Sequence, residues 1–189
     1  MGHGSPSVMS WYLECDVVVP RDTSPTPTTW QVPPSGFFKI NVDGAASDDG
    51  RPSSIGVVIR DCWGFLIAAS NKILPVPFSA EITEAMALQE GVLLASKMGI
   101  SHVIVESDAL AIIQAIIESD LGGELGHIVQ NIKDISSSFS WCFFQHLKMS
   151  GSRAAHEFAR AARISGVSQV WKGVCPSFVK RVILKGGGL

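Results

Sequence analysis

The stretch Phe37-Phe38-Lys39-Ile40-Asn41-Val42-Asp43-Gly44-Ala45 decides the fold of this chain. Phe38, Ile40 and Val42 alternate with polar residues, which predicts a β-strand with one hydrophobic face. The strand runs directly into the carboxylate of Asp43, and two small residues follow it. A carboxylate that leaves a hydrophobic strand loses hydration, and a bound cation would compensate for that loss. An Asp-Gly turn between two strands is the competing interpretation.

The composition is that of a packed globular domain. The chain has 189 residues, of which 46% are hydrophobic and 17% charged, and its net charge is −2. This balance argues against tight, nonspecific binding of nucleic acid. We expect no transmembrane segment, because no apolar stretch is long enough. The four cysteines form no CxxC motif, which favours an intracellular protein in a reducing compartment, the nucleus or the cytoplasm.

The pattern predicts one α/β domain with two flanking segments. Residues 1–35 are rich in Pro, Ser and Thr and indicate a linker or extension, residues 36–166 form the domain, and 167–189 are a C-terminal tail that packs on it or trails it. The expected strands cover residues 37–42, 55–60, 65–74, 103–106 and 139–147, and the expected helices cover 79–98, 109–119, 125–136 and 152–164. This order predicts a five-stranded mixed sheet, three strands antiparallel and two parallel, flanked by helices.

Two further acidic residues are placed to join Asp43. Glu84 lies near the start of the first expected helix, close to its small and apolar stripe. It could also be a solvated first-turn acid. Asp108 ends the fourth strand, where it could instead cap the next helix. Because sites in α/β folds form at the carboxyl ends of strands, the three carboxylates are expected to converge. Oxygen ligands of this kind select Mg²⁺ or Mn²⁺.

Five motifs in order resemble the ribonuclease H superfamily and, more closely, the plant RNase H-like domain of reverse-transcriptase-related proteins. They are Asn41-Val42-Asp43-Gly44-Ala45, Gly56-Val57-Val58-Ile59-Arg60-Asp61, Glu84-Ala85-Met86-Ala87-Leu88-Gln89-Glu90-Gly91, Val105-Glu106-Ser107-Asp108 and Ala154-Ala155-His156-Glu157-Phe158-Ala159. The resemblance covers residues 30 to about 180. It implies an RNase H-like fold and an endonuclease that hydrolyses the RNA strand of RNA–DNA hybrids with two metal ions.

The resemblance also assigns roles to residues. Asp43, Glu84 and Asp108 take three of the four acidic metal-binding positions, and His156 stands at the fourth. Imidazole is a poor ligand for Mg²⁺ but acceptable for Mn²⁺, so reduced activity or a preference for Mn²⁺ is expected. His146 stands near the place of a mobile histidine that helps turnover in the family, although it could equally be a polar residue at a strand end.

Contacts with the substrate are less well marked. Candidates are Asn41, Ser107, Arg60 and Arg153, each of which could instead be a solvated surface residue. RNA–DNA hybrids are held through backbone, 2′-hydroxyls and shape, for which such side chains are suited. Two alternatives to the ribonuclease stay open. One is a catalytically reduced RNase H-like module that binds nucleic acid or a protein, and the other is an exonuclease or transposase-like nuclease of the same superfamily.

Overall fold

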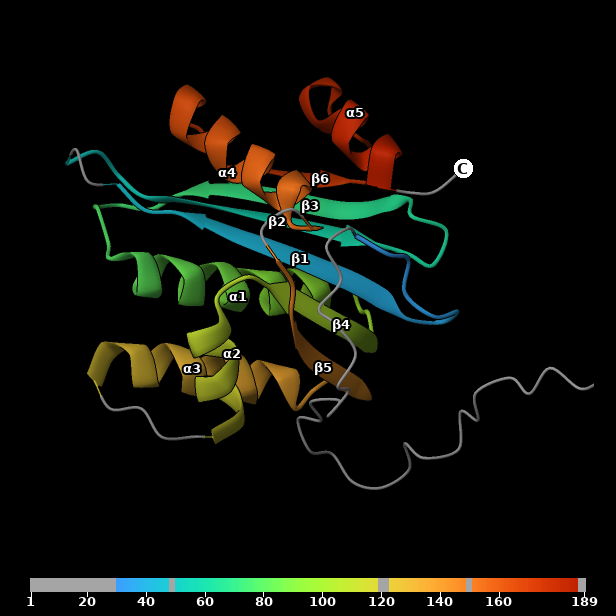
Figure 1. The fold of residues 1–189 in the computed structure, drawn as a ribbon, viewed down its shortest axis with the longest axis horizontal. Coiled ribbons are helices and arrows are strands. Elements are labelled where there is room, and N and C mark those ends of the chain that lie inside the picture. The colour runs from blue at the N-terminus through green and yellow to red at the C-terminus, as the bar shows by residue number, and fades with distance from the viewer. Residues whose placement is uncertain (1–29, 48–49, 119–122, 149–150, 187–189) are drawn as a thin grey trace, which may run out of the picture.

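The computed structural model describes residues 30–47, 50–118, 123–148 and 151–186. Within these ranges three strands come first, and the remaining helices and strands follow up to α5 (Figure 1). They are β1 (Phe38–Ala45), β2 (Ser54–Arg60), β3 (Leu66–Ile73), α1 (Ala80–Lys97), β4 (His102–Ser107), α2 (Leu110–Glu118), α3 (Gly123–Ser136), β5 (Trp141–His146), α4 (Arg153–Ser165), β6 (Gln169–Lys172) and α5 (Ser177–Gly186).

The sheet is mixed, as the sequence predicts. Its strand order is β5-β4-β1-β2-β3-β6. Strands β1, β2 and β3 form an antiparallel meander, whereas β4 is parallel to β1 and β5 is parallel to β4. The α/β class is confirmed, and each of the five expected strands is present. The sheet has six strands, however, so the expected total of five is wrong. The additional strand, β6, is antiparallel to β3, and its four residues are mostly exposed, so they carry no hydrophobic alternation.

Helices cover both faces of the sheet (Figure 1). On one face, Ile40 and Val42 are fully buried against α1. A Cβ atom at Gly91 of α1 would lie 2.7 Å from Val42 Cγ1, so this glycine permits the close approach of helix and sheet. On the other face α4 crosses β2 at Gly56, where an added Cβ would collide with the backbone of α4. The end of β1 therefore lies between α1 and α4.

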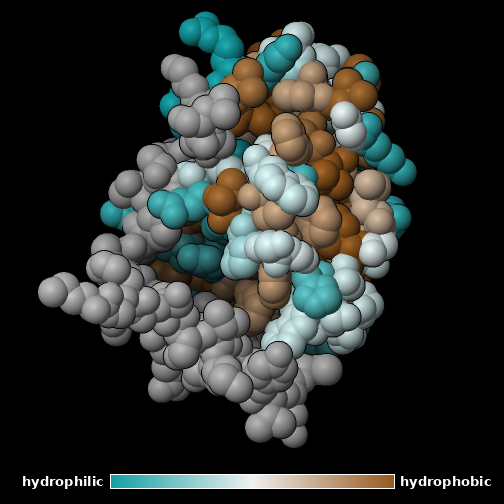
Figure 2. All heavy atoms as spheres, turned by 90° about the vertical axis from the view of Figure 1, so that its right-hand side faces the viewer, coloured by the Kyte–Doolittle hydropathy of each residue, from teal (hydrophilic) through white to brown (hydrophobic). Residues whose placement is uncertain are grey.

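The C-terminal elements share a core with α4. Val179 and Ile183 of α5 are buried beside Phe158, whose ring lies 5.1 Å from that of Trp171 in β6. Figure 2 shows the side of the molecule where β2 turns into β3, and hydrophobic residues gather in the upper half of this face.

Among the described residues, no helix combines the length and apolar character needed to cross a membrane.

Candidate metal centre

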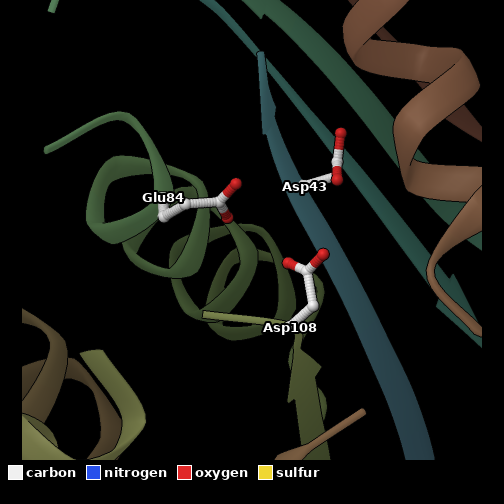
Figure 3. Close-up of side chains that lie close together, drawn as sticks. All are labelled: Asp43, Glu84 and Asp108. Carbon is white, nitrogen blue, oxygen red and sulfur yellow. The ribbon is translucent and has the colours of Figure 1, made fainter. Parts of the chain in front are cut away.

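Three secondary-structure elements bring the acidic residues together. Asp43 lies on β1, Glu84 lies in the second turn of α1, and Asp108 directly follows β4. The parallel register pairs Asn41 with Glu106, so the residues two positions further along each strand, Asp43 and Asp108, end level with each other. The close-up in Figure 3 shows the three carboxylates directed toward one point.

The backbone at Gly44 allows Glu84 to reach the other two acids. A Cβ atom at this position would lie 3.0 Å from the backbone nitrogen of Glu84, so a side chain here would press against α1. The Gly44 N–H instead donates a hydrogen bond to Oε1 of Glu84, at 3.2 Å. The small residue after Asp43 thus lets the helix pack close and holds one oxygen of Glu84 in place.

The geometry of the acids suits a hard divalent ion. One oxygen from each of Asp43, Glu84 and Asp108 lies within 4.8 Å of the others. The second oxygen of Glu84, Oε2, is buried and has no hydrogen-bond partner. A buried carboxylate oxygen without a partner is unfavourable unless a cation or proton satisfies it. The donor set is carboxylate oxygen alone, which fits Mg²⁺ or Mn²⁺.

Burial raises the pKa of two of these acids, Glu84 and Asp43, and neighbouring negative charge adds to the rise. Burial is the main reason that the pKa of Glu84 rises to about 8, and the negative charges of Asp43 and Asp108 add to the effect. Burial likewise raises the pKa of Asp43 to about 6, although His156 acts in the opposite direction. Because burial disfavours the ionised forms of these carboxylates, a bound cation would stabilise them.

His156 contacts this cluster from α4. Its Nδ1 atom lies 3.0 Å from Oδ2 of Asp43, and its side chain is 53% exposed. Within the described part of the chain, the group whose ligand atoms all lie mutually close comprises the three carboxylates and does not include this histidine. His156 is therefore a neighbour of Asp43 on the solvent side of the cluster.

Asn41 and Arg60, which the sequence offers as substrate contacts, lie inside the protein. Arg60 Nη2 donates to Oδ1 of Asn41 at 2.9 Å, and Nδ2 of Asn41 donates to Glu106 Oε2 at 2.8 Å. Lys39 completes the network through an ion pair with Glu106 at 2.8 Å. Trp30 covers it, with its ring centre 3.4 Å from Cζ of Arg60. A direct contact with substrate would require Trp30 to move, and in this arrangement the network joins β1 to β2 and β4.

The other predicted residues lie around the ends of strands and helices. Ser107 is fully buried, and its hydroxyl accepts a hydrogen bond from the Ala109 backbone, which places it at the start of α2. His146 ends β5 in register with Ser107 and is half-buried. Arg153 is exposed at the first position of α4. Their roles in substrate binding or turnover stay predictions.

Sequence reasoning missed three members of the buried network, Trp30, Lys39 and Glu106. Lys39 and Asn41 are two residues apart on β1, so they share the face that also carries Asp43. That polar alternation was a usable signal for a charged strip on this face. Trp30 offered no such signal, because it precedes two prolines in a segment whose composition indicates a linker.

Solved structures of ribonucleases H share this fold. RNase H1 from the archaeon Halobacterium salinarum matches with a TM-score of 0.63 and 14% identity, covering 69% of this chain and 99% of that one. The N-terminal RNase H domain of a Mycobacterium tuberculosis protein matches with a TM-score of 0.63 and 17% identity, covering 68% of this chain and 94% of that one. LC11-RNase H1, solved in complex with an RNA/DNA hybrid, matches with a TM-score of 0.61 and 21% identity, covering 68% of this chain and 98% of that one. Curated proteins gave no significant match.

This chain therefore has the fold of these ribonucleases H, with an acidic cluster at one end of its sheet. A family model described as reverse transcriptase-like matches residues 41–162. This range is well over half of the chain and runs from the strand of Asp43 to the helix of His156. The chain belongs to the reverse transcriptase-like family.

Proposed function

We propose that this protein is a metal-dependent endonuclease of the ribonuclease H type that hydrolyses the RNA strand of RNA–DNA hybrids. The observation that carries the proposal is the convergence of Asp43, Glu84 and Asp108 at one end of the sheet, with oxygens within 4.8 Å of one another. The family match and the fold of LC11-RNase H1, which was solved with a hybrid, support the choice of substrate.

The three carboxylates would hold Mg²⁺ or Mn²⁺, and the resemblance implies two ions. Ions in such a site supply activation of a water for in-line attack on a phosphodiester and stabilisation of the leaving 3′ oxygen. The chain's own contribution is to fix the ligands. The Gly44 N–H orients Glu84 through Oε1, which leaves the buried Oε2 without a hydrogen-bond partner and available to an ion. The register of β1 with β4 sets the separation of Asp43 and Asp108.

A catalytically reduced module that binds nucleic acid or a protein is the second candidate. The observation that favours it is the hydrogen bond between His156 and Asp43, at 3.0 Å. A histidine in this position occupies one lone pair of a metal-binding carboxylate and contributes no negative charge of its own. Either function is compatible with the nucleus or the cytoplasm, which we keep as the predicted compartment.

Hydrolysis of a labelled RNA–DNA hybrid separates the two candidates. We expect cleavage by the full chain in Mg²⁺ or, more strongly, in Mn²⁺. Replacing one carboxylate of such a cluster, as in Asp43→Asn, should reduce the rate by roughly 100-fold or more. If the wild-type protein cuts no faster than Asp43→Asn in either metal, the nuclease proposal is wrong and the binding module is favoured.

A further inference from the structure

A cationic hollow lies beside the acidic cluster, and His156 is part of its lining. Its volume is about 550 Å³. The residues that line it are Ala45, Arg51, His156, Arg160, Arg163 and Ile164. They come from the end of β1, the connection to β2 and one side of α4. Figure 1 shows α4 passing over the sheet toward this connection.

One face of α4 supplies most of the positive charge. His156, Arg160 and Arg163 stand at positions i, i+4 and i+7, which places them in a row along the helix. Arg51, three residues before the start of β2, also lines the hollow. The whole chain has a net charge of −2, so three arginines around one hollow are a local concentration of positive charge.

The arginines differ in how firmly they are held. Arg163 donates to the Ala46 carbonyl and to Oγ of Ser47, each at 3.3 Å, which fastens this guanidinium to the end of β1. Arg160 has a 62% exposed side chain and a long ion pair of 3.5 Å with Glu157 on the same helix. An exposed pair of this length is weak, so Arg160 can turn toward an anion at low cost.

The hollow adjoins the acidic cluster through His156. His156 lines the hollow and at the same time touches Asp43. Ala45 is two residues beyond Asp43 on β1, a step of about 7 Å along a strand. Arg160 is one helical turn beyond His156, a step of about 6 Å. These steps are comparable to the spacing of successive phosphates along a nucleic-acid strand.

We propose that the hollow bounded by Arg51, Arg160 and Arg163 binds a backbone phosphate of a nucleic-acid strand, next to the phosphodiester that lies at the acidic cluster. Guanidinium groups are suited to phosphate because their donors match its oxygens in pairs. The assignment deepens the proposed nuclease function and rests on it. It adds a sequence-independent contact that holds the strand in register with Asp43.

Binding of a fluorescently labelled RNA–DNA hybrid, measured by anisotropy on the full chain in EDTA, tests this without cleavage. Arg160→Gln should weaken binding about fivefold and lower the slope of log K against log salt by about 0.9, as expected for one lost phosphate contact. Arg160→Lys should recover part of the affinity. Glu157→Gln should tighten binding about twofold, because it removes the competing carboxylate.

Arg181→Gln is the matched control. Arg181 is an exposed arginine of α5, away from the hollow, so its loss should leave the salt slope unchanged. The site assignment is overturned if Arg160→Gln and Arg181→Gln have equal effects, or if polyglutamate competes as well per charge as the hybrid does. Thermal melting of each variant confirms folding. If the wild-type protein cleaves the hybrid with neither Mg²⁺ nor Mn²⁺ but Arg160→Gln still weakens binding, the nuclease proposal is wrong. The phosphate site is then still supported.

Discussion

Nδ1 of His156 and Oδ2 of Asp43 lie 3.0 Å apart, which ties α4 directly to the strand that carries the first acid of the cluster. The contact has two opposing effects on a metal site. It stabilises the ionised form of Asp43 and so partly offsets the rise in its pKa caused by burial. It also occupies a carboxylate oxygen that a metal ion would otherwise use.

His156→Asp should strengthen binding of Mg²⁺ by roughly tenfold, because it adds a fourth carboxylate and releases Oδ2 of Asp43. Isothermal titration with Mg²⁺ measures the affinity, and hybrid cleavage measures the gain in rate. His156→Ala is the control, since it breaks the contact without adding a ligand. Equal affinities for the two variants would mean that a carboxylate at position 156 does not reach the ion.

Glu84 should make the metal-free protein less stable as the pH rises. Its pKa is about 8 in the folded protein and 4.5 ordinarily, so above about pH 4.5 the unfolded chain releases a proton that the folded protein retains. The contribution of Glu84 to stability is therefore complete below pH 4.5 and is lost progressively up to about pH 8. Thermal melting in EDTA across this range should show the decline.

Two variants and the addition of a divalent metal ion test whether Glu84 causes this loss of stability. Glu84→Gln should flatten the decline and raise the melting temperature at pH 8 by several degrees, whereas Glu81→Gln, an exposed acid of the same helix, should not. Mn²⁺ or Mg²⁺ should stabilise the wild type at pH 8 and not Glu84→Gln. A melting temperature of the wild type that rises from pH 5 to 8 in parallel with Glu84→Gln would contradict the assignment.

Trp30→Ala should lower the free energy of unfolding by about 3 kcal/mol, the usual cost of removing a buried large aromatic side chain. Trp30 is 7% exposed and stacks on Arg60, so its loss also exposes the buried network to water. Urea denaturation measures the change. Trp63→Ala is the control, because Trp63 is 73% exposed and should cost no more than about 0.5 kcal/mol. Equal costs would show that the stacking on Arg60 contributes little.

The acidic cluster was predictable because each of its members stands at the end of a strand or near the start of a helix. Asp43 and Asp108 terminate hydrophobic runs, and parallel pairing of those runs is enough to bring them together. The same reasoning could not place Arg60, whose hydrophobic neighbours in β2 mark a strand but do not reveal a partner on β1. Contacts between side chains distant in the sequence depend on register and on which face each residue occupies.

Part of the arginine-lined hollow could be predicted from the sequence, and part of it could not. The spacing of His156, Arg160 and Arg163 can be read from the sequence as one helical face. Arg51 is more than one hundred residues away, in a connection whose path the sequence does not specify. The edge strand β6 escaped prediction for a different reason: strand identity there comes from pairing with β3, not from the hydrophobicity of its own residues.

Gly56 has a consequence for how this site could change in evolution. The backbone of α4 rests directly on the Cα atom of this glycine, so any side chain at position 56 would push the helix away from β2. His156 would move outward with the helix, while Asp43, Glu84 and Asp108 would stay where the sheet and α1 hold them. A residue one hundred positions before the histidine, with no functional group at all, therefore sets how close His156 lies to Asp43. Relatives that differ at this glycine should differ in metal preference even when their acidic residues are identical.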